Sequence, residues 1–360
     1  MRKPKVHLLC EHGLDRRPLG CSYIRLLRPL MHPCNEGRLD VSTGRDVDAG
    51  GADIVVVERM WRHDLSLEMA EQLVDRIRKH RSCLIYTTDD NLLDLEYVPT
   101  EQKTAMRYLA READGVIVST APLADRLQGL NRTLRVVQNA LDERLFFDAV
   151  RQHRRPRPHG RRKVIGYMGT GTHDADVMMV LQALRAVLRK YRDVLELQFV
   201  GAVAQPATVH AFAGLPIRLV PVAGGCGEYP KFVSWMIHNT SFDLAIAPLE
   251  DTNFTRCKSD LKFLDYSALG IAGIYSRVPS YEKTVRHLET GYLAENTPEA
   301  WADALECLLE DDSLRENMAA KAQQYVFSSR MLRNCATAWQ TAITSIWRQS
   351  FSAGRLKDAA

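Results

Sequence analysis

The chain has 360 residues, with 48 lysine and arginine residues against 44 aspartate and glutamate residues. This length exceeds the usual size of one domain, so it predicts two. Seven of the basic residues lie within residues 151–163, which contain no acidic residue. The rest of the chain is therefore slightly acidic, and this argues against a general nucleic-acid binder.

The eight cysteines are scattered and include no Cys-x-x-Cys pair, so they predict free thiols in a reducing compartment. The apolar run near the N-terminus is short and is soon followed by charged residues, which favours a strand over a signal peptide. No stretch of eighteen or more apolar residues occurs, so no segment is expected to span a membrane. Together these features predict a cytoplasmic protein.

Short apolar runs alternate with helical patterns along the first half, which is typical of a parallel α/β sheet. The expected strands are residues 6–10, 54–57, 84–86, 116–118 and 134–137, and the expected helices are 66–79, 101–113 and 121–127. Carboxyl ends of parallel strands face the ligand crevice, so the residues that follow them are candidates for chemistry. His12, Asp89 and Asp90 stand at such ends. Purely structural roles stay open: a loop histidine, a helix cap at Asp90 and a solvated Asp89.

Residues 151–163 interrupt both periodicities and contain two prolines and a glycine, which is the composition of a linker. Such a basic run can contact anionic lipid headgroups, although a solvated tether fits it equally. A second α/β pattern follows. Its expected strands are 164–168, 195–200, 217–220, 244–247 and 271–275, and its expected helices are 298–309 and 313–325. A last helix from about residue 331 carries Trp339 and Trp347 on one stripe, so we expect it to pack on the first domain.

The loop 169–173 follows the first strand of the second half. It fails the dinucleotide-binding pattern, because Asp174 stands at the third glycine position. Small residues let backbone N–H groups approach a ligand closely, although an ordinary tight turn fits as well. The candidate ligand-binding residues here are Gly169, Gly171, Thr172 and His173.

Residues 245–276 predict a buried strand, a polar loop, a helix that begins near residues 258–259, and a second strand. The first N–H groups of a helix lack intrahelical partners, so a helix start at the end of a parallel sheet can bind an anion. Lys258, Ser259 and Lys262 would add donors and charge in the first turn, and Asp265 would meet a hydroxyl group one turn later. The segment therefore predicts a site for a nucleotide-sugar diphosphate. A phosphate-binding P-loop is absent, since Lys258 and Ser259 have no glycine-rich lead.

Six stretches carry a resemblance to a known family: RRPLGCSYIRLLRPL, IYTTDDNLLD, VSTAPLADRLQGLNRTLRVVQNALD, VIGYMGTGTHDADV, DLAIAPLEDTNFTRCKSDLKFLDYSALGIAGIYS and GYLAENTPEAWADAL. The chain resembles bacterial GT-B glycosyltransferases of the retaining, GT4-like kind that build O-antigen and other surface polysaccharides. The resemblance implies two Rossmann-like α/β domains that face each other across a cleft, with the C-terminal helix crossing back to the first domain. The implied borders are an acceptor domain at 1–150, a linker at 151–163, a donor domain at 164–328 and the helix at 329–360.

The resemblance implies that the protein is a hexosyl- or deoxyhexosyltransferase. It would use a nucleotide-diphosphate sugar as donor and would need no cofactor and no metal. Lys258 and Lys262 would stabilise the leaving diphosphate, with Ser259 beside them, and Asp265 would hold the nucleotide ribose. Glu250, Thr172 and His173 would orient the donor, while Asp89, Asp90 or His12 would face a glycan or lipid-linked glycan acceptor. The basic linker would allow peripheral contact with the inner face of a membrane.

Two departures from the family pattern keep other functions open. Cys257 stands where relatives have a paired glutamate, and Asp265 replaces a glutamate. A sugar-nucleotide epimerase with a GT-B-like fold and a non-catalytic partner in glycan assembly therefore remain alternatives.

Overall fold

The computed structural model describes residues 2–47, 51–146, 161–169, 173–201 and 205–352. The chain divides into two compact units. Unit 1 comprises Met1–Asp142, Cys257–Ser259 and Met331–Ala360, and unit 2 comprises Glu143–Arg256 and Asp260–Arg330. Most of the predicted linker lies outside the described residues, so the borders expected at residues 150, 164 and 328 stay predictions.

Unit 1 contains a six-stranded, all-parallel sheet. In spatial order the strands are β2 (Asp40–Gly44), β1 (Lys5–Leu9), β3 (Ile54–Glu58), β4 (Cys83–Thr88), β5 (Gly115–Val118) and β6 (Leu134–Val136). The order reverses between β1 and β3, because β1 connects to β2 on one side and the later strands add on the other. Such a reversal opens a crevice at the carboxyl ends of the two strands.

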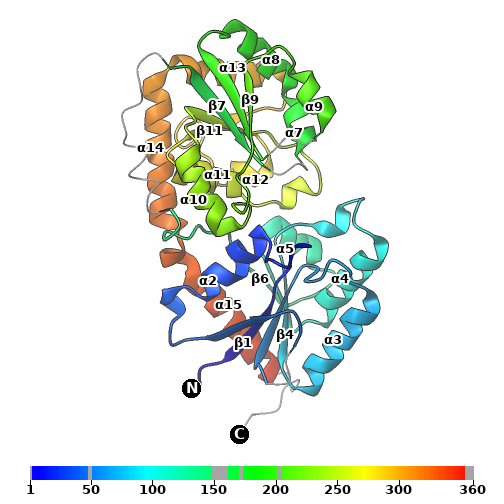
Figure 1. Ribbon diagram of the computed structural model, residues 1–360. Coiled ribbons are helices and arrows are strands. Elements are labelled where there is room, and N and C mark those ends of the chain that lie inside the picture. Colours follow the sequence, from blue (N-terminus) through cyan, green and yellow to red (C-terminus); the bar gives the residue numbers. More distant parts are fainter. Residues whose placement is uncertain (1, 48–50, 147–160, 170–172, 202–204, 353–360) are drawn as a thin grey trace. The chain divides into compact units, whose positions relative to one another are not determined.

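Helices cover both faces of this sheet, so its central strands β3, β4 and β5 are buried along their whole length (Figure 1). One face packs against α3 (Leu67–Lys79), α4 (Thr100–Glu112) and α5 (Ala121–Leu127). The other packs against α1 (Gly20–Ser22), the π-helix η1 (Tyr23–Leu27), α2 (Arg28–Leu30) and α15 (Leu332–Ser352). The short 3₁₀ turns are η2 (Pro33–Asn35) and η3 (Leu92–Asp94).

The C-terminal helix α15 belongs to unit 1, as the stripe of large apolar residues predicted. Trp339, Ile343 and Ile346 are buried against the sheet, while Trp347 is partly buried. The helix lies close to β5, because a Cβ atom on Gly115 would lie 2.8 Å from the Ile346 side chain. The expectation that the last helix packs on the first domain is therefore confirmed.

Unit 2 contains a second six-stranded, all-parallel sheet. In spatial order the strands are β12 (Tyr292–Ala294), β11 (Ala272–Ser276), β10 (Leu244–Ala247), β7 (Lys163–Met168), β8 (Leu195–Val200) and β9 (Ile217–Val220). This is the strand order of dinucleotide-binding Rossmann sheets, and the reversal lies between β7 and β10. The loops after these two strands therefore border the expected crevice of unit 2.

The helices of unit 2 also cover two faces of the sheet. The largest core cluster joins one face to α7 (Asp174–Met179), α8 (Leu181–Lys190) and α13 (Pro298–Glu310). Helices α11 (Leu261–Ala268) and α14 (Asp312–Ser329) pack on each other and on β11. The remaining elements are α9 (Pro206–Ala211), α10 (Tyr229–Asn239), α12 (Pro279–Glu282) and the 3₁₀ turn η4 (Thr255–Cys257).

One expectation from the sequence is wrong. Helix α11 begins at Leu261 and is preceded by η4, so Lys258 and Ser259 lie in the intervening loop and not in the first helical turn. The sequence also missed β2 and β12 at the two sheet edges, and helices α9 and α10. Within the described part of the chain, no helix combines the length and apolar character that crossing a bilayer requires.

Candidate functional site

In unit 1, a buried network of charged residues joins the ends of β1 and β3. Glu58 ends β3, and its carboxylate accepts a hydrogen bond from the backbone N–H of Glu11 at 2.9 Å and another from the Ser22 hydroxyl. The Arg59 guanidinium lies 2.8 Å from the Glu11 carboxylate and 3.4 Å from that of Asp89. The network therefore fixes three strand ends at the point where the strand order reverses.

The environment of this network favours protonated carboxyl groups. Burial raises the pKa of Glu58 to about 7, although hydrogen bonds from Ser22 and Glu11 oppose the shift. Burial also raises the pKa of Glu11, and the nearby charge of Arg59 opposes that shift. Glu58 is only 1% exposed, and its Oε1 atom has no hydrogen-bond partner among the described residues. A buried acceptor without a partner is costly, so it is a candidate for contact with a ligand.

Asp89 and Asp90 follow β4, and each is neutralised by a different cation. Asp89 faces Arg59, while the Asp90 carboxylate lies 3.2 Å from the Lys258 ammonium group. The next short helix is η3, and its N-cap is Asn91, so Asp90 is not its cap. These two cations offset the repulsion between the adjacent carboxylates of Asp89 and Asp90. Both side chains remain partly exposed at the end of the sheet.

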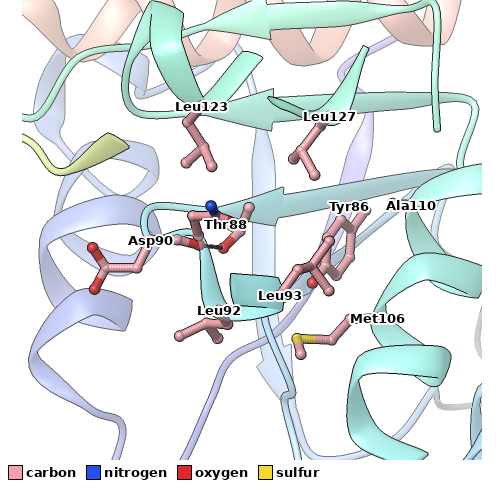
Figure 2. Close-up of a pocket in the computed structure, with 10 residues that line it drawn as sticks. Tyr86, Thr88, Asp90, Leu92, Leu93, Met106, Ala110, Leu123 and Leu127 are labelled. Atoms are coloured by element: carbon pink, nitrogen blue, oxygen red, sulfur yellow. Dashed lines mark hydrogen bonds between the residues drawn. The ribbon is translucent and has the colours of Figure 1, made fainter. Parts of the chain in front are cut away.

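Figure 2 shows a small cavity beside Asp90, between Leu123 and Leu127 on one side and Leu92, Leu93 and Met106 on the other. The Asp90 carboxylate points away from these apolar side chains. The cavity has a volume of about 10 Å³, which is room for no more than one water molecule. It is a gap in the core and not a sugar-binding site.

His12 follows β1 and is half-buried. Its Nδ1 atom lies 2.7 Å from the carbonyl oxygen of Cys10. A carbonyl can only accept, so Nδ1 carries the proton in this contact and Nε2 is left to accept or, when protonated, to donate. The contact with Cys10 fixes the orientation of the His12 ring at the strand end, and the predicted role of His12 stays a prediction.

Cys257 and Ser259 also belong to unit 1. The Cys257 side chain is 5% exposed and lies in the core beside α4 and α5, and its carbonyl accepts a hydrogen bond from Thr120 at 2.8 Å. Ser259 accepts a hydrogen bond from the Asn139 side chain at 2.8 Å. These contacts and the Lys258–Asp90 pair explain why residues 257–259 group with unit 1 and not with the helix that follows them.

In unit 2, Asp176 joins the two loops that border the strand reversal. One of its carboxylate oxygens lies 2.8 Å from Nδ1 of His173, and the other accepts the backbone N–H of Glu250 at 3.0 Å. Asp176 is 7% exposed, whereas Glu250 is exposed. Sequence reasoning selected His173 and Glu250 but missed Asp176, whose signal is its position one helical turn after His173.

Only part of the predicted glycine loop can be placed. The backbone N–H of Gly169 donates to the carbonyl of Val200 at 3.2 Å, so this amide is already paired within the sheet. That contact argues against the expected approach of the Gly169 amide to a ligand. Gly171 and Thr172 lie outside the described residues.

Helix α11 carries two of the charged residues that the sequence selected, Lys262 and Asp265. The Lys262 ammonium lies 3.0 Å from the Tyr167 hydroxyl and 4.4 Å from the centre of its ring. One turn later, the Oδ1 atom of Asp265 is buried without a hydrogen-bond partner among the described residues. Burial raises the pKa of Asp265 to about 7, and the charge of Lys262 opposes the shift. Next to it, Tyr266 ties the helix to β10 through a 3.0 Å hydrogen bond to Ile246.

Lys258 and Ser259 contact Asp90 and Asn139 of unit 1, whereas Lys262 contacts Tyr167 of unit 2. The start of α11 is fixed by Asp260, whose buried carboxylate forms two hydrogen bonds, of 2.7 and 3.0 Å, with Arg330. These findings place the residues, while their roles in binding and catalysis remain predictions.

Comparisons with known proteins agree with this architecture. Residues 162–311 match a family described as glycosyl transferases group 1. A search of curated proteins gave no match.

Several solved structures share the fold of the whole chain. HepE of Anabaena, solved with UDP and glucose, is 11% identical over 96% of this chain and 100% of its own, with a TM-score of 0.66. A glycosyltransferase from Rickettsia africae ESF-5 is 11% identical over 97% of this chain and 100% of its own, with a TM-score of 0.62. TarM is 13% identical over 81% of this chain, with a TM-score of 0.57, and the chain spans 54% of its length.

The family match and the shared fold confirm the resemblance to GT-B glycosyltransferases, while the surface-polysaccharide type stays a prediction. Residues 162–311 match the group 1 glycosyl transferases, and the chain shares the two-domain α/β fold of the solved GT-B glycosyltransferases.

Proposed function

We propose that the protein transfers a sugar from a nucleotide-diphosphate donor to a glycan or lipid-linked glycan acceptor. The observation that carries the proposal is the pair of Lys262 and Asp265 on one turn of α11 in unit 2. It combines a cation with a buried carboxylate oxygen that has no partner among the described residues. The match of this unit to the group 1 glycosyl transferases supports the proposal, as does the occurrence of UDP and glucose in HepE.

Each member of the pair suits one part of such a donor. Lys262 lies in the first turn of α11, where its charge and the free N–H groups would stabilise the negative charge that develops on a leaving diphosphate. Asp265 would accept hydrogen bonds from the ribose hydroxyls, which favour its ionised form. Asp176 holds His173 and the backbone of Glu250, so these two would orient the donor sugar.

Unit 1 would then receive the acceptor. The Asp89 and Asp90 carboxylates and Nε2 of His12 stand at strand ends, where they can accept hydrogen bonds from sugar hydroxyls. Retention of configuration, independence of metal and a hexosyl or deoxyhexosyl donor are parts of the proposal that rest on the family resemblance. Lys258 is assigned here to the acceptor side, because it pairs with Asp90.

The proposal is tested by Lys262→Met, with Lys321→Met on an exposed position of α14 as the matched control. A panel of nucleotide diphosphates and their sugars is first screened by thermal shift, since a ligand selective for the folded state stabilises it. We expect Lys262→Met to weaken binding of the selected donor by roughly ten- to a hundredfold, because a charge-assisted phosphate contact contributes about 1.5–3 kcal/mol. Equal donor affinity in Lys262→Met and wild type would refute the assignment.

Incubation with the donor alone separates the alternative functions. A transferase releases nucleoside diphosphate slowly or only with an acceptor, whereas an epimerase forms an isomeric sugar nucleotide without one. Donor binding without release or transfer across a panel of acceptors would instead indicate a non-catalytic partner.

A further inference from the structure

A surface pocket of about 320 Å³ lies in unit 1 beside His12. Its lining is strongly basic and includes His12, Leu14, Arg16, Arg45, Arg62 and Asp64. The volume falls within the range of pockets that hold small ligands. Because His12 follows β1 and also lines the pocket, the pocket adjoins the end of the strand where we place the acceptor.

Two of the arginines in this pocket form no ion pair with the part of the chain that the structure describes. Arg62 forms two hydrogen bonds of 2.9 Å with Asp64, so those charges neutralise each other. Neither Arg16 nor Arg45 forms an ion pair with any residue that the structure describes, and both are exposed. The pocket thus has an excess of two positive charges with histidine neutral.

The wall that carries Arg45 is held in place by the core. Trp61, which also lines the pocket, is 5% exposed, and its indole N–H donates to the backbone carbonyl of Arg45 at 3.2 Å. This hydrogen bond anchors the backbone of Arg45 to the core of unit 1.

The chemistry of the pocket selects a phosphate. Guanidinium groups bind phosphate oxygens through paired N–H donors, so two of them suit a phosphate or diphosphate group. The neighbouring strand ends carry Asp89 and Asp90, which would repel a phosphate but accept hydrogen bonds from sugar hydroxyls. An acceptor with a phosphate at one end and a glycan at the other would therefore bind in a single orientation.

The rim of the pocket favours a phosphate that belongs to a lipid-linked molecule over a soluble phosphate. Leu14 is 86% exposed and lies two residues from Arg16. An exposed leucine beside arginines suits a membrane interface, where the apolar side chain enters the lipid and the cations meet headgroups. We propose that this pocket binds the phosphate group of a lipid-linked acceptor presented at a membrane surface. The inference rests on the proposed function, whose acceptor it specifies.

The first experiment measures binding of the full chain to vesicles by sedimentation, with phosphatidylcholine vesicles that contain or lack phosphatidylglycerol. We expect Arg16→Gln with Arg45→Gln to lower binding to the anionic vesicles by roughly thirtyfold at low salt, as expected for the loss of two arginines at an anionic surface. The matched control is Arg107→Gln with Arg111→Gln, which removes two exposed charges from α4 of the same unit. An equal loss in both pairs would show general attraction between charges and overturn the proposal.

The second experiment tests phosphate itself, by calorimetric titration of inorganic pyrophosphate into protein that carries Lys262→Met to weaken the donor site. Pyrophosphate should bind, and Arg16→Gln with Arg45→Gln should weaken it at least about tenfold. No difference between these variants would overturn the phosphate assignment. The result is independent of donor binding, so it is distinguishable from failure of the proposed function.

Leu14→Ser separates a lipid from a soluble source. If the acceptor is lipid-linked, Leu14→Ser lowers vesicle binding severalfold and leaves pyrophosphate affinity unchanged. Unchanged binding of Leu14→Ser to vesicles would overturn the lipid source. Leu14 and both arginines are exposed, so the substitutions are not expected to disturb folding, and circular dichroism checks this.

Discussion

Replacing Glu58 by glutamine should stabilise the protein above neutral pH, because the structure holds this carboxyl in an unfavourable place. A pKa raised from the ordinary value of 4.5 to about 7 corresponds to about 3 kcal/mol in favour of the protonated group. Glutamine keeps an oxygen that can accept from Ser22 and from the backbone of Glu11. Its buried amide lacks a partner, however, so we expect a net gain of about 2 kcal/mol at pH 8.

The sign of the effect follows from the protons that each state binds. Between about pH 4.5 and pH 7 the unfolded chain has released the proton of Glu58, while the folded chain still holds it. The folded state binds more protons there, so the contribution of Glu58 to stability falls as the pH rises through this window and is constant above it. Glutamine does not titrate, so Glu58→Gln does not lose stability in this window. The difference in free energy of unfolding between Glu58→Gln and wild type should therefore shift by about 3 kcal/mol in favour of the variant from pH 4 to pH 8.

Amide hydrogen exchange in β1 and β3 is the suitable assay, because it reports on unit 1 within a chain of two units that need not unfold together. The control is Glu71→Gln, an exposed position on α3, which should show no such dependence on pH. A constant difference between Glu58→Gln and wild type across this pH range would refute the argument that burial of Glu58 destabilises the fold.

Three further substitutions test contacts within unit 1 or within unit 2. Gly115→Ala should destabilise unit 1 by about 1–3 kcal/mol, because the new methyl group would lie 2.8 Å from Ile346 of α15, and urea denaturation measures the loss. Arg330→Met should destabilise unit 2 by about 3–5 kcal/mol in the same assay, since it leaves the buried Asp260 unpaired, and adding Asp260→Asn should recover part of the loss. Thr297→Ala removes the N-cap of α13, where the hydroxyl accepts the Ala300 N–H at 3.2 Å, and should lower thermal stability by about 1 kcal/mol.

The fold was predictable because its central strands are buried on both faces. Such strands are continuous apolar runs, as in Ile54–Glu58, and they stand out between helical patterns. Edge strands give no such signal. Strand β2 is mostly exposed and consists of Asp40, Val41, Ser42, Thr43 and Gly44, so only its pairing with β1 identifies it as a strand.

The site was less predictable, because long-range contacts decide where its helix starts. Lys258 and Lys262 are four residues apart, a spacing that would place both on one face of a helix. In the structure the helix begins only after Asp260, which is held by Arg330 from far along the chain, while Lys258 pairs with Asp90. Both partners, Asp90 and Arg330, are distant in sequence from this segment, so the sequence pattern alone does not reveal the contacts. Asp176 was missed for a similar reason, since its importance lies in its hydrogen bond to the loop of Glu250.

Cys257 shows how the structure changes the meaning of a departure from the family pattern. In sequence it stands where relatives have a glutamate, which suggested a lost catalytic group. In the structure its side chain is buried among apolar residues of unit 1, and burial raises the pKa of its thiol. A carboxylate would be unfavourable there without a cation. Cysteine therefore contributes to core packing at this position. The proposed donor site at Lys262 and Asp265 stays a prediction, which donor-binding experiments can test directly.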